Sequence, residues 1–181
     1  MKHTVVAWME DRPGVLTRVT SLFRRRGFNI ESLAVGHSET EGISRMTFVV
    51  SGDERMVDQA VKQLEKQVDV TRVEDVTNQP AVVRELALVK VRTDAQTRAE
   101  VMQIVDIYRA QIVDVALDSL VIQAIGTEDR VDSLVELLSA FGVVEMVRTG
   151  RVAMTRGRAQ RGLNGQPTSA AVKANGRKMG I

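Results

Sequence analysis

The order of secondary-structure signals repeats once along this chain of 181 residues, and this repeat limits the fold more than any other feature. Each half has a strand-like apolar run, apolar residues at helical spacing, two more strand-like runs, a second helical pattern and a final strand-like run. These segments fall at residues 3–9, 15–23, 29–36, 43–51, 56–64 and 68–76, and again at 84–92, 101–108, 111–116, 119–126, 131–141 and 143–149. The order βαββαβ therefore predicts an α+β protein with two ferredoxin-like domains in tandem, each an antiparallel sheet with helices on one face.

Polar stretches set the predicted boundaries between these units. Thr77-Asn78-Gln79-Pro80 is polar and ends in a proline, which cannot donate to a strand ladder. Residues 151–181 carry seven Lys/Arg and no Asp or Glu. Their Gly- and Ala-rich end has almost no apolar periodicity, which is typical of a poorly ordered tail. We therefore predict domains at 1–76 and 84–156, a linker at 77–83 and a basic tail at 157–181.

The first strand carries apolar residues on both of its faces. Val5-Val6-Ala7-Trp8-Met9 does not alternate between polar and apolar residues, as a strand with one solvated face should. We therefore expect something to pack on both faces of this strand, which favours a homodimer or a larger complex.

Composition excludes several classes of protein. The chain has no cysteine, so disulfides, thiolate metal sites and a cysteine nucleophile are excluded. Its two histidines, His3 and His37, lie in no metal-binding spacing, and no glycine-rich phosphate loop occurs. Because the whole chain carries +2 and residues 151–181 carry +7, residues 1–150 carry −5, which argues against a nucleic-acid surface. We predict no catalytic, metal or cofactor site, no signal peptide and no membrane span, and a cytoplasmic location, or a plastid if a transit peptide was removed.

One strand–turn–helix junction has the chemistry to hold a small amino acid. Gly14 permits close approach to the backbone, and the helix that starts there favours a carboxylate. Asn29 begins the next strand, and its amide can bind an ammonium or a carboxylate. Val15, Leu16 and Ile30 supply a small apolar wall. These residues have a simpler interpretation without a ligand, as a turn that requires glycine and an asparagine at the start of a strand. On the chemistry alone, this simpler interpretation is favoured.

The first domain resembles an ACT domain, the βαββαβ module that binds amino acids at a dimer interface. Two motifs bring the resemblance closer, to the small subunit of acetolactate synthase: Glu10-x-x-x-Gly14-x-Leu16-x-Arg18-Val19-x-x-Leu22-Phe23 and Arg26-Gly27-Phe28-Asn29-Ile30-Glu31-Ser32-Leu33. Further similar runs are Ser44-Arg45-Met46-Thr47, Arg84-Glu85-Leu86-Ala87-Leu88-Val89-Lys90-Val91 and Ala110-Gln111-Ile112-Val113-Asp114-Val115. The resemblance covers roughly residues 1–158 in the right order and spacing.

This resemblance implies a regulatory subunit that is not itself an enzyme. A large catalytic subunit would carry thiamine diphosphate, a divalent metal and FAD, and would condense pyruvate with pyruvate or 2-oxobutyrate. The small subunit would carry no cofactor, activate its partner and confer feedback inhibition by a branched-chain amino acid, usually valine, otherwise leucine or isoleucine. Its ACT domains would pair as a homodimer with effector sites at the interface. The carried-over effector residues are Asp11, Pro13, Gly14, Val15, Leu16, Asn29 and Ile30.

Two features depart from the family, and three other functions remain open. Asp11 stands where the family also has asparagine, and the tail beyond about residue 160 has no counterpart. A stand-alone ACT-type sensor with another client enzyme is the first alternative. An RNA-binding module would need stacking aromatics, but strand 43–51 offers only Phe48. A ferredoxin-like hydrolase would need a phosphate loop that this sequence lacks.

Overall fold

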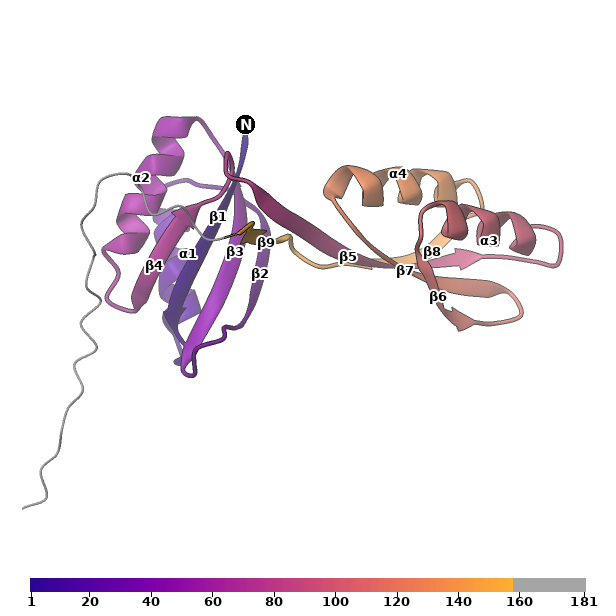
Figure 1. Cartoon of the computed structure of the whole chain (residues 1–181), viewed down its shortest axis with the longest axis horizontal. Coiled ribbons are helices and arrows are strands. Elements are labelled where there is room, and N and C mark those ends of the chain that lie inside the picture. The colour runs from indigo at the N-terminus through magenta and orange to yellow at the C-terminus, as the bar shows by residue number, and fades with distance from the viewer. Residues whose placement is uncertain (158–181) are drawn as a thin grey trace, which may run out of the picture.

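The structure, a computed structural model, describes residues 1–157 (Figure 1). The first domain consists of β1 (Lys2–Glu10), α1 (Val15–Arg25), β2 (Ile30–His37), β3 (Ile43–Ser51), α2 (Glu54–Glu65) and β4 (Val70–Asp75). Its strands pair antiparallel in the order β2-β3-β1-β4, with both helices on one face (Figure 1). This order places β2 at one edge of the sheet.

The second domain repeats this arrangement. It consists of β5 (Ala81–Arg92), α3 (Arg98–Ile107), β6 (Gln111–Val115), β7 (Ser119–Gly126), α4 (Glu128–Ser139) and β8 (Val143–Arg148). The antiparallel strand order β6-β7-β5-β8 is the counterpart of the first sheet. The predicted fold of two tandem ferredoxin-like domains is confirmed.

Each domain has its own core between sheet and helices, and both cores are mainly aliphatic. In the first, Phe23 of α1 packs edge-to-face on Phe48 of β3, with ring centroids 4.9 Å apart. In the second, valines from β5 and α3 meet leucines from β7 and α4. The apolar periodicity of the helices matches these buried faces, so local sequence and packing agree.

A short strand after the second domain was not predicted. β9 (Val152–Thr155) pairs antiparallel with residues 81–84, the start of β5. The sequence pattern predicts a last strand at 143–149, and β9 corrects that prediction. β5 also begins at Ala81, within the segment that we propose as the linker. The two paired stretches form a ribbon, residues 81–84 with 152–155, that joins the domains (Figure 1).

The ribbon covers the face of the first sheet that points away from the helices. Val5, Ala7 and Met9 of β1 belong to the first core, whereas Val6 packs with Val76 and Ala153 in a separate cluster. Trp8 and Val83 border this cluster. Part of the cover expected on the second face of β1 is therefore provided by the chain itself.

Trp8 lies between two cations on this covered face. The Arg45 and Arg72 guanidinium carbons are 5.0 Å and 4.6 Å from the indole ring centroid. Arg45 also donates a hydrogen bond of 2.6 Å to the Ala153 carbonyl of β9. Trp8 thus helps to hold the ribbon.

Within residues 1–157, no helix has the length and apolar character needed to cross a membrane. Apart from Gly157, the predicted tail at 157–181 lies outside the described residues.

Candidate functional site

The turn between β1 and α1 is shaped by Gly14. Its φ of 85° is in the left-handed region that favours glycine, and it stands at the start of α1 with no side-chain cap. The first turn of α1 holds no acidic residue, so the partial positive charge of the helix start is not neutralised from within the helix. The nearby cations have partners already, since Arg12 pairs with Glu10 and Arg18 with Asp69. This turn has the electrostatics to receive a carboxylate.

The residues predicted around this turn differ in exposure. Asp11 and Pro13 are exposed, and an Asp11 carboxylate oxygen lies 3.0 Å from Nδ1 of His37 at the end of β2. Val15 is only 2% exposed and packs in the core, whereas Leu16 is 41% exposed. Leu16 is therefore the apolar side chain that a ligand at this turn would meet directly.

Asn29 and Ile30 lie at the opposite end of the same sheet. Ile30 pairs with Val50, which also pairs with His3 near the start of β1. The Gly14 turn instead follows Glu10, at the other end of β1. Glu10 follows His3 by seven positions along the extended strand, a distance of roughly 23 Å. One chain alone therefore does not bring the two halves of the predicted effector site together.

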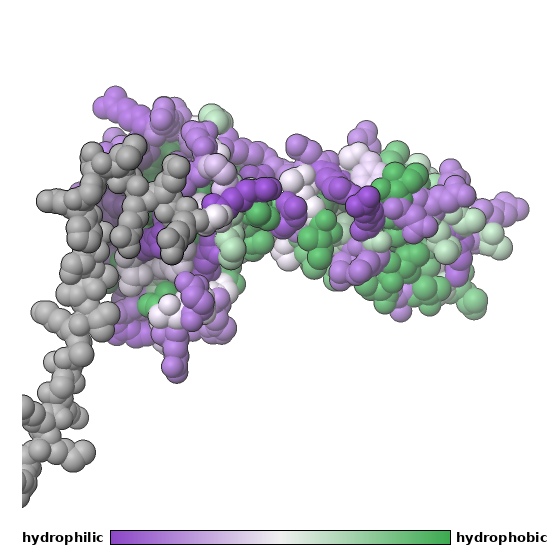
Figure 2. Space-filling view, in the orientation of Figure 1, coloured by the Kyte–Doolittle hydropathy of each residue, from purple (hydrophilic) through white to green (hydrophobic). Residues whose placement is uncertain are grey.

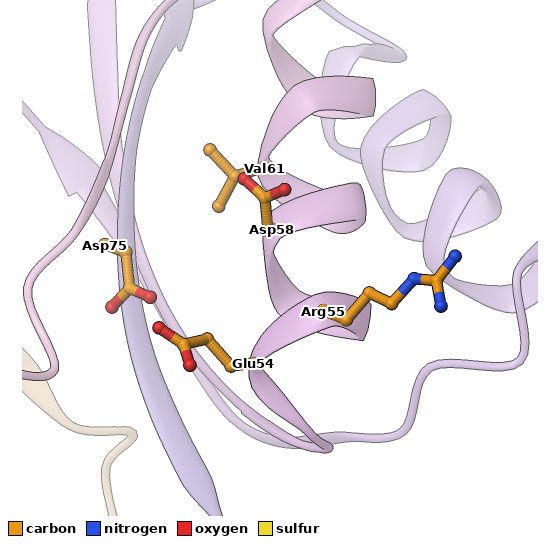
Figure 3. A pocket seen from close by; sticks show the side chains of 5 residues that line it. All are labelled: Glu54, Arg55, Asp58, Val61 and Asp75. Carbon is orange, nitrogen blue, oxygen red and sulfur yellow. The ribbon is translucent and has the colours of Figure 1, made fainter.

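A cleft that the sequence analysis did not single out lies between α2 and β4. It has a volume of about 510 Å³ and is lined by Glu54, Arg55, Asp58, Val61 and Asp75. Figure 3 shows the Glu54 and Asp75 carboxylates directed toward the space between helix and strand, and Arg55 directed away from it. Asp58 pairs with Lys62 at 2.6 Å, and Asp75 accepts the Thr77 N–H at 2.9 Å. No group of three or more potential metal ligands exists among residues 1–157, so this cleft offers negative charge without a metal-binding arrangement.

Comparisons with known proteins agree along both domains. Residues 7–72 match the family model described as the AHAS small subunit-like ACT domain, and residues 84–157 match the one described as the small subunit of acetolactate synthase. A probable acetolactate synthase small subunit of Archaeoglobus fulgidus is 48% identical over 157 residues, which cover 87% of this chain and 98% of that protein. The acetolactate synthase small subunit of Bacillus subtilis is 48% identical over 162 residues, covering 89% and 94%.

A solved structure shows the same architecture. The crystal structure of the acetolactate synthase small subunit from Thermotoga maritima superimposes with a TM-score of 0.82 at 40% sequence identity. The match covers 88% of this chain and 99% of that one. The likeness therefore extends through both domains and is not confined to the first one.

Proposed function

Since this chain belongs to the acetolactate synthase small-subunit family, we propose that it is a regulatory subunit that activates the catalytic large subunit and makes it sensitive to valine. Thiamine diphosphate, the divalent metal and FAD would belong to the large subunit, and the complex would act in the cytoplasm. The role in branched-chain amino-acid biosynthesis follows from the same premise. The effector site is the part of this proposal that the geometry supports best.

The observation that carries the proposal is the position of β2 at the edge of the first sheet. The Gly14 turn flanks the end of β2, because Asp11 touches His37, whereas Asn29 precedes its start. Antiparallel pairing of two β2 strands about a twofold axis would set the start of each strand against the end of the other. Asn29 of one copy would then face the Gly14 turn of the second copy. A homodimer would complete two effector sites that one chain leaves open.

The chemistry of such a composite site fits a small branched amino acid. The uncapped start of α1 would receive the carboxylate through backbone N–H groups. The Asn29 amide would bind the polar end of the ligand, and Leu16 and Ile30 would enclose a short apolar side chain. Valine fits this description, and leucine and isoleucine are the alternatives that a titration would compare.

We propose that the large subunit binds mainly to the second domain. Of the nineteen exposed large apolar side chains in residues 1–157, eleven lie in the second domain, between Leu88 and Val147. Figure 2 shows apolar surface gathered on this domain. On the sheet face opposite the helices, Leu88, Val121 and Val147 line one shallow pocket with Lys90 and Glu145. Apolar surface of this extent is typical of a protein-binding face.

The proposal is tested first with the purified chain, the large subunit and two variants of the site. Purified chain alone should not turn over pyruvate, should stimulate the large subunit, and should make the complex sensitive to valine. Asn29→Ala should weaken valine binding about ten- to a hundredfold, the loss of one hydrogen bond to a charged group. Gly14→Asp should abolish binding, because it adds a like charge and a Cβ at φ 85°. Asn78→Ala, an exposed asparagine outside the site, is the matched control.

The two damaged chains should complement each other. A dimer of one Asn29→Ala chain and one Gly14→Asp chain contains one intact site, because the undamaged turn and the undamaged asparagine come from different copies. Mixing the variants should therefore restore partial inhibition by valine. Two variants that stay fully sensitive, or a mixture that gains nothing, would show that the effector site is built differently.

A further inference from the structure

Four charged side chains meet where the second domain touches the first. Lys2 Nζ of β1 lies 2.9 Å from Glu128, the first residue of α4, and 3.4 Å from Glu31 of β2. The second oxygen of Glu128 pairs with Arg151, which follows β8 and precedes the ribbon strand β9. We call Lys2, Glu31, Glu128 and Arg151 the charged junction. It links the start of β2 directly to the start of α4.

The backbone beside the charged junction is fixed on the first domain. The Arg151 N–H donates a hydrogen bond of 2.9 Å to the Ser32 hydroxyl, and Arg151 Nη1 lies 3.2 Å from the Thr4 hydroxyl. Gly150 packs directly on the backbone of Leu33 and Ala34. The Arg151 side chain is 18% exposed, so its charge is largely withdrawn from water. Arg151 is thus anchored on β2, and Glu128 joins it to the second domain.

The charges in the junction depend on one another. Hydrogen bonding and attraction to Glu128 raise the pKa of Lys2, with a smaller contribution from Glu31. The Ser51 hydroxyl, which donates to Glu31, lowers the pKa of that carboxyl, and Lys2 adds to the effect. Glu128 bridges two cations. Without its charge, Arg151 would lose its carboxylate partner in the junction, and Lys2 would keep only Glu31.

The junction adjoins the half of the effector site that contains Asn29 and Ile30. The pairing of β2 with β3 shifts register between Ile30 and Ser32, so Glu31 occupies an irregular position in the strand. Such irregularities often mark functional positions, where a small backbone change re-aims side chains. A ligand that fixes Asn29 and Ile30 would therefore act on Glu31, the adjacent residue.

We propose that the charged junction carries the effector signal to the second domain, with Glu128 as the positioning residue that couples β2 to α4. The inference rests on the proposed function, which places the effector beside Asn29 and the large subunit on the second domain. Effector binding changes the preferred position of Glu31. Lys2 and Glu128 then convert that change into a different orientation of α4 and the sheet beneath it. A signal of this kind requires that the effector bind one arrangement of the junction better than the other.

The test separates effector binding from its consequence. Glu128→Gln removes the bridging charge at nearly constant shape, and Glu136→Gln removes an exposed charge from the same helix as the control. In the reconstituted complex, Glu128→Gln should leave stimulation and the calorimetric Kd for valine within about twofold of the parent. Its inhibition at saturating valine should fall about fivefold or more. Lys2→Gln should act in the same way, and the double variant should be no worse than either single variant.

Three results would count against the proposed role of the charged junction or against the proposed function. Full inhibition in Glu128→Gln, when the parent is inhibited, overturns the inference. Loss of stimulation together with inhibition also overturns it, because the junction would then be needed for assembly. If valine does not inhibit the complex made with the unmodified chain, the proposed function is contradicted and the junction is not tested by this assay. In that case amide hydrogen exchange of the chain is the test. Lys2→Gln should speed exchange of the Val131 amide, which donates to the Thr127 carbonyl at the start of α4, and unchanged exchange there overturns the junction itself.

Discussion

Replacing Gly150 by alanine tests whether the ribbon holds the two domains together. A Cβ at position 150 would lie 2.5 Å from the carbonyl carbon of Leu33 and 2.9 Å from the amide nitrogen of Ala34. Both atoms belong to the backbone of β2, so no side-chain rotation can relieve the overlap. The segment must move away from β2, which also breaks the hydrogen bond from Arg151 N–H to Ser32.

Overpacking of a protein interior typically lowers the free energy of unfolding by about 1–3 kcal/mol. For a chain of this size, this corresponds to a fall in Tm of about 2–12 °C. Differential scanning calorimetry measures the loss, and amide hydrogen exchange should show faster exchange in β9. Gly36→Ala is the matched control, since a Cβ there meets nothing within 4 Å and should change Tm very little. A Gly150→Ala chain with parental Tm and parental exchange in β9 would refute the close packing of this segment on β2.

Two further predictions concern the second domain. Partial burial lowers the pKa of Arg148, but its hydrogen bonds to Glu85 and Asp132 outweigh this and raise it. Arg148→Met should therefore lower the free energy of unfolding in urea by about 1–3 kcal/mol, because it leaves Glu85, which is 9% exposed, without its cation. Adding Glu85→Met should recover most of that loss, because no unpaired buried charge then remains. The N–H and hydroxyl of Thr97 lower the pKa of Asp94. The Asp94 carboxylate therefore stabilises the turn before α3 above the unfolded pKa of about 3.9, and this contribution is lost as the pH falls through the lower folded value. Exchange of the Thr97 amide in acid should show that loss, and Asp94→Ala should abolish the pH dependence.

Most of the fold was predictable because every element except β9 carries its own signal. Val15, Val19, Leu22 and Phe23 recur at helical spacing, and all four are buried in α1. β9 carries no such signal. It has four residues, and its buried residue Ala153 is covered only because it packs on Val6, far away in the chain. A strand that exists through a long-range contact leaves too little periodicity to detect in a sequence.

The candidate site was predictable in its local chemistry and not in its assembly. The left-handed φ of Gly14 follows from a glycine between a strand and a helix. The separation between Gly14 and Asn29 depends on the register of β1, β2 and β3, which residue types do not specify. The contact between Lys2 and Glu128 joins positions 126 residues apart, and it depends on how the second domain is docked. Such contacts are decided by tertiary packing.

The continuity of β5 has a consequence for anyone who wishes to separate the two domains. Its first four residues belong to the ribbon on the first sheet, and the remainder forms the centre of the second sheet. A truncation after Pro80 would strip Val6 and Trp8 of their cover, and the excised second half would carry an unsupported two-stranded ribbon. The two domains therefore cannot be separated by a simple cut in the chain. A usable first-domain fragment would need polar substitutions on the face that the ribbon leaves bare.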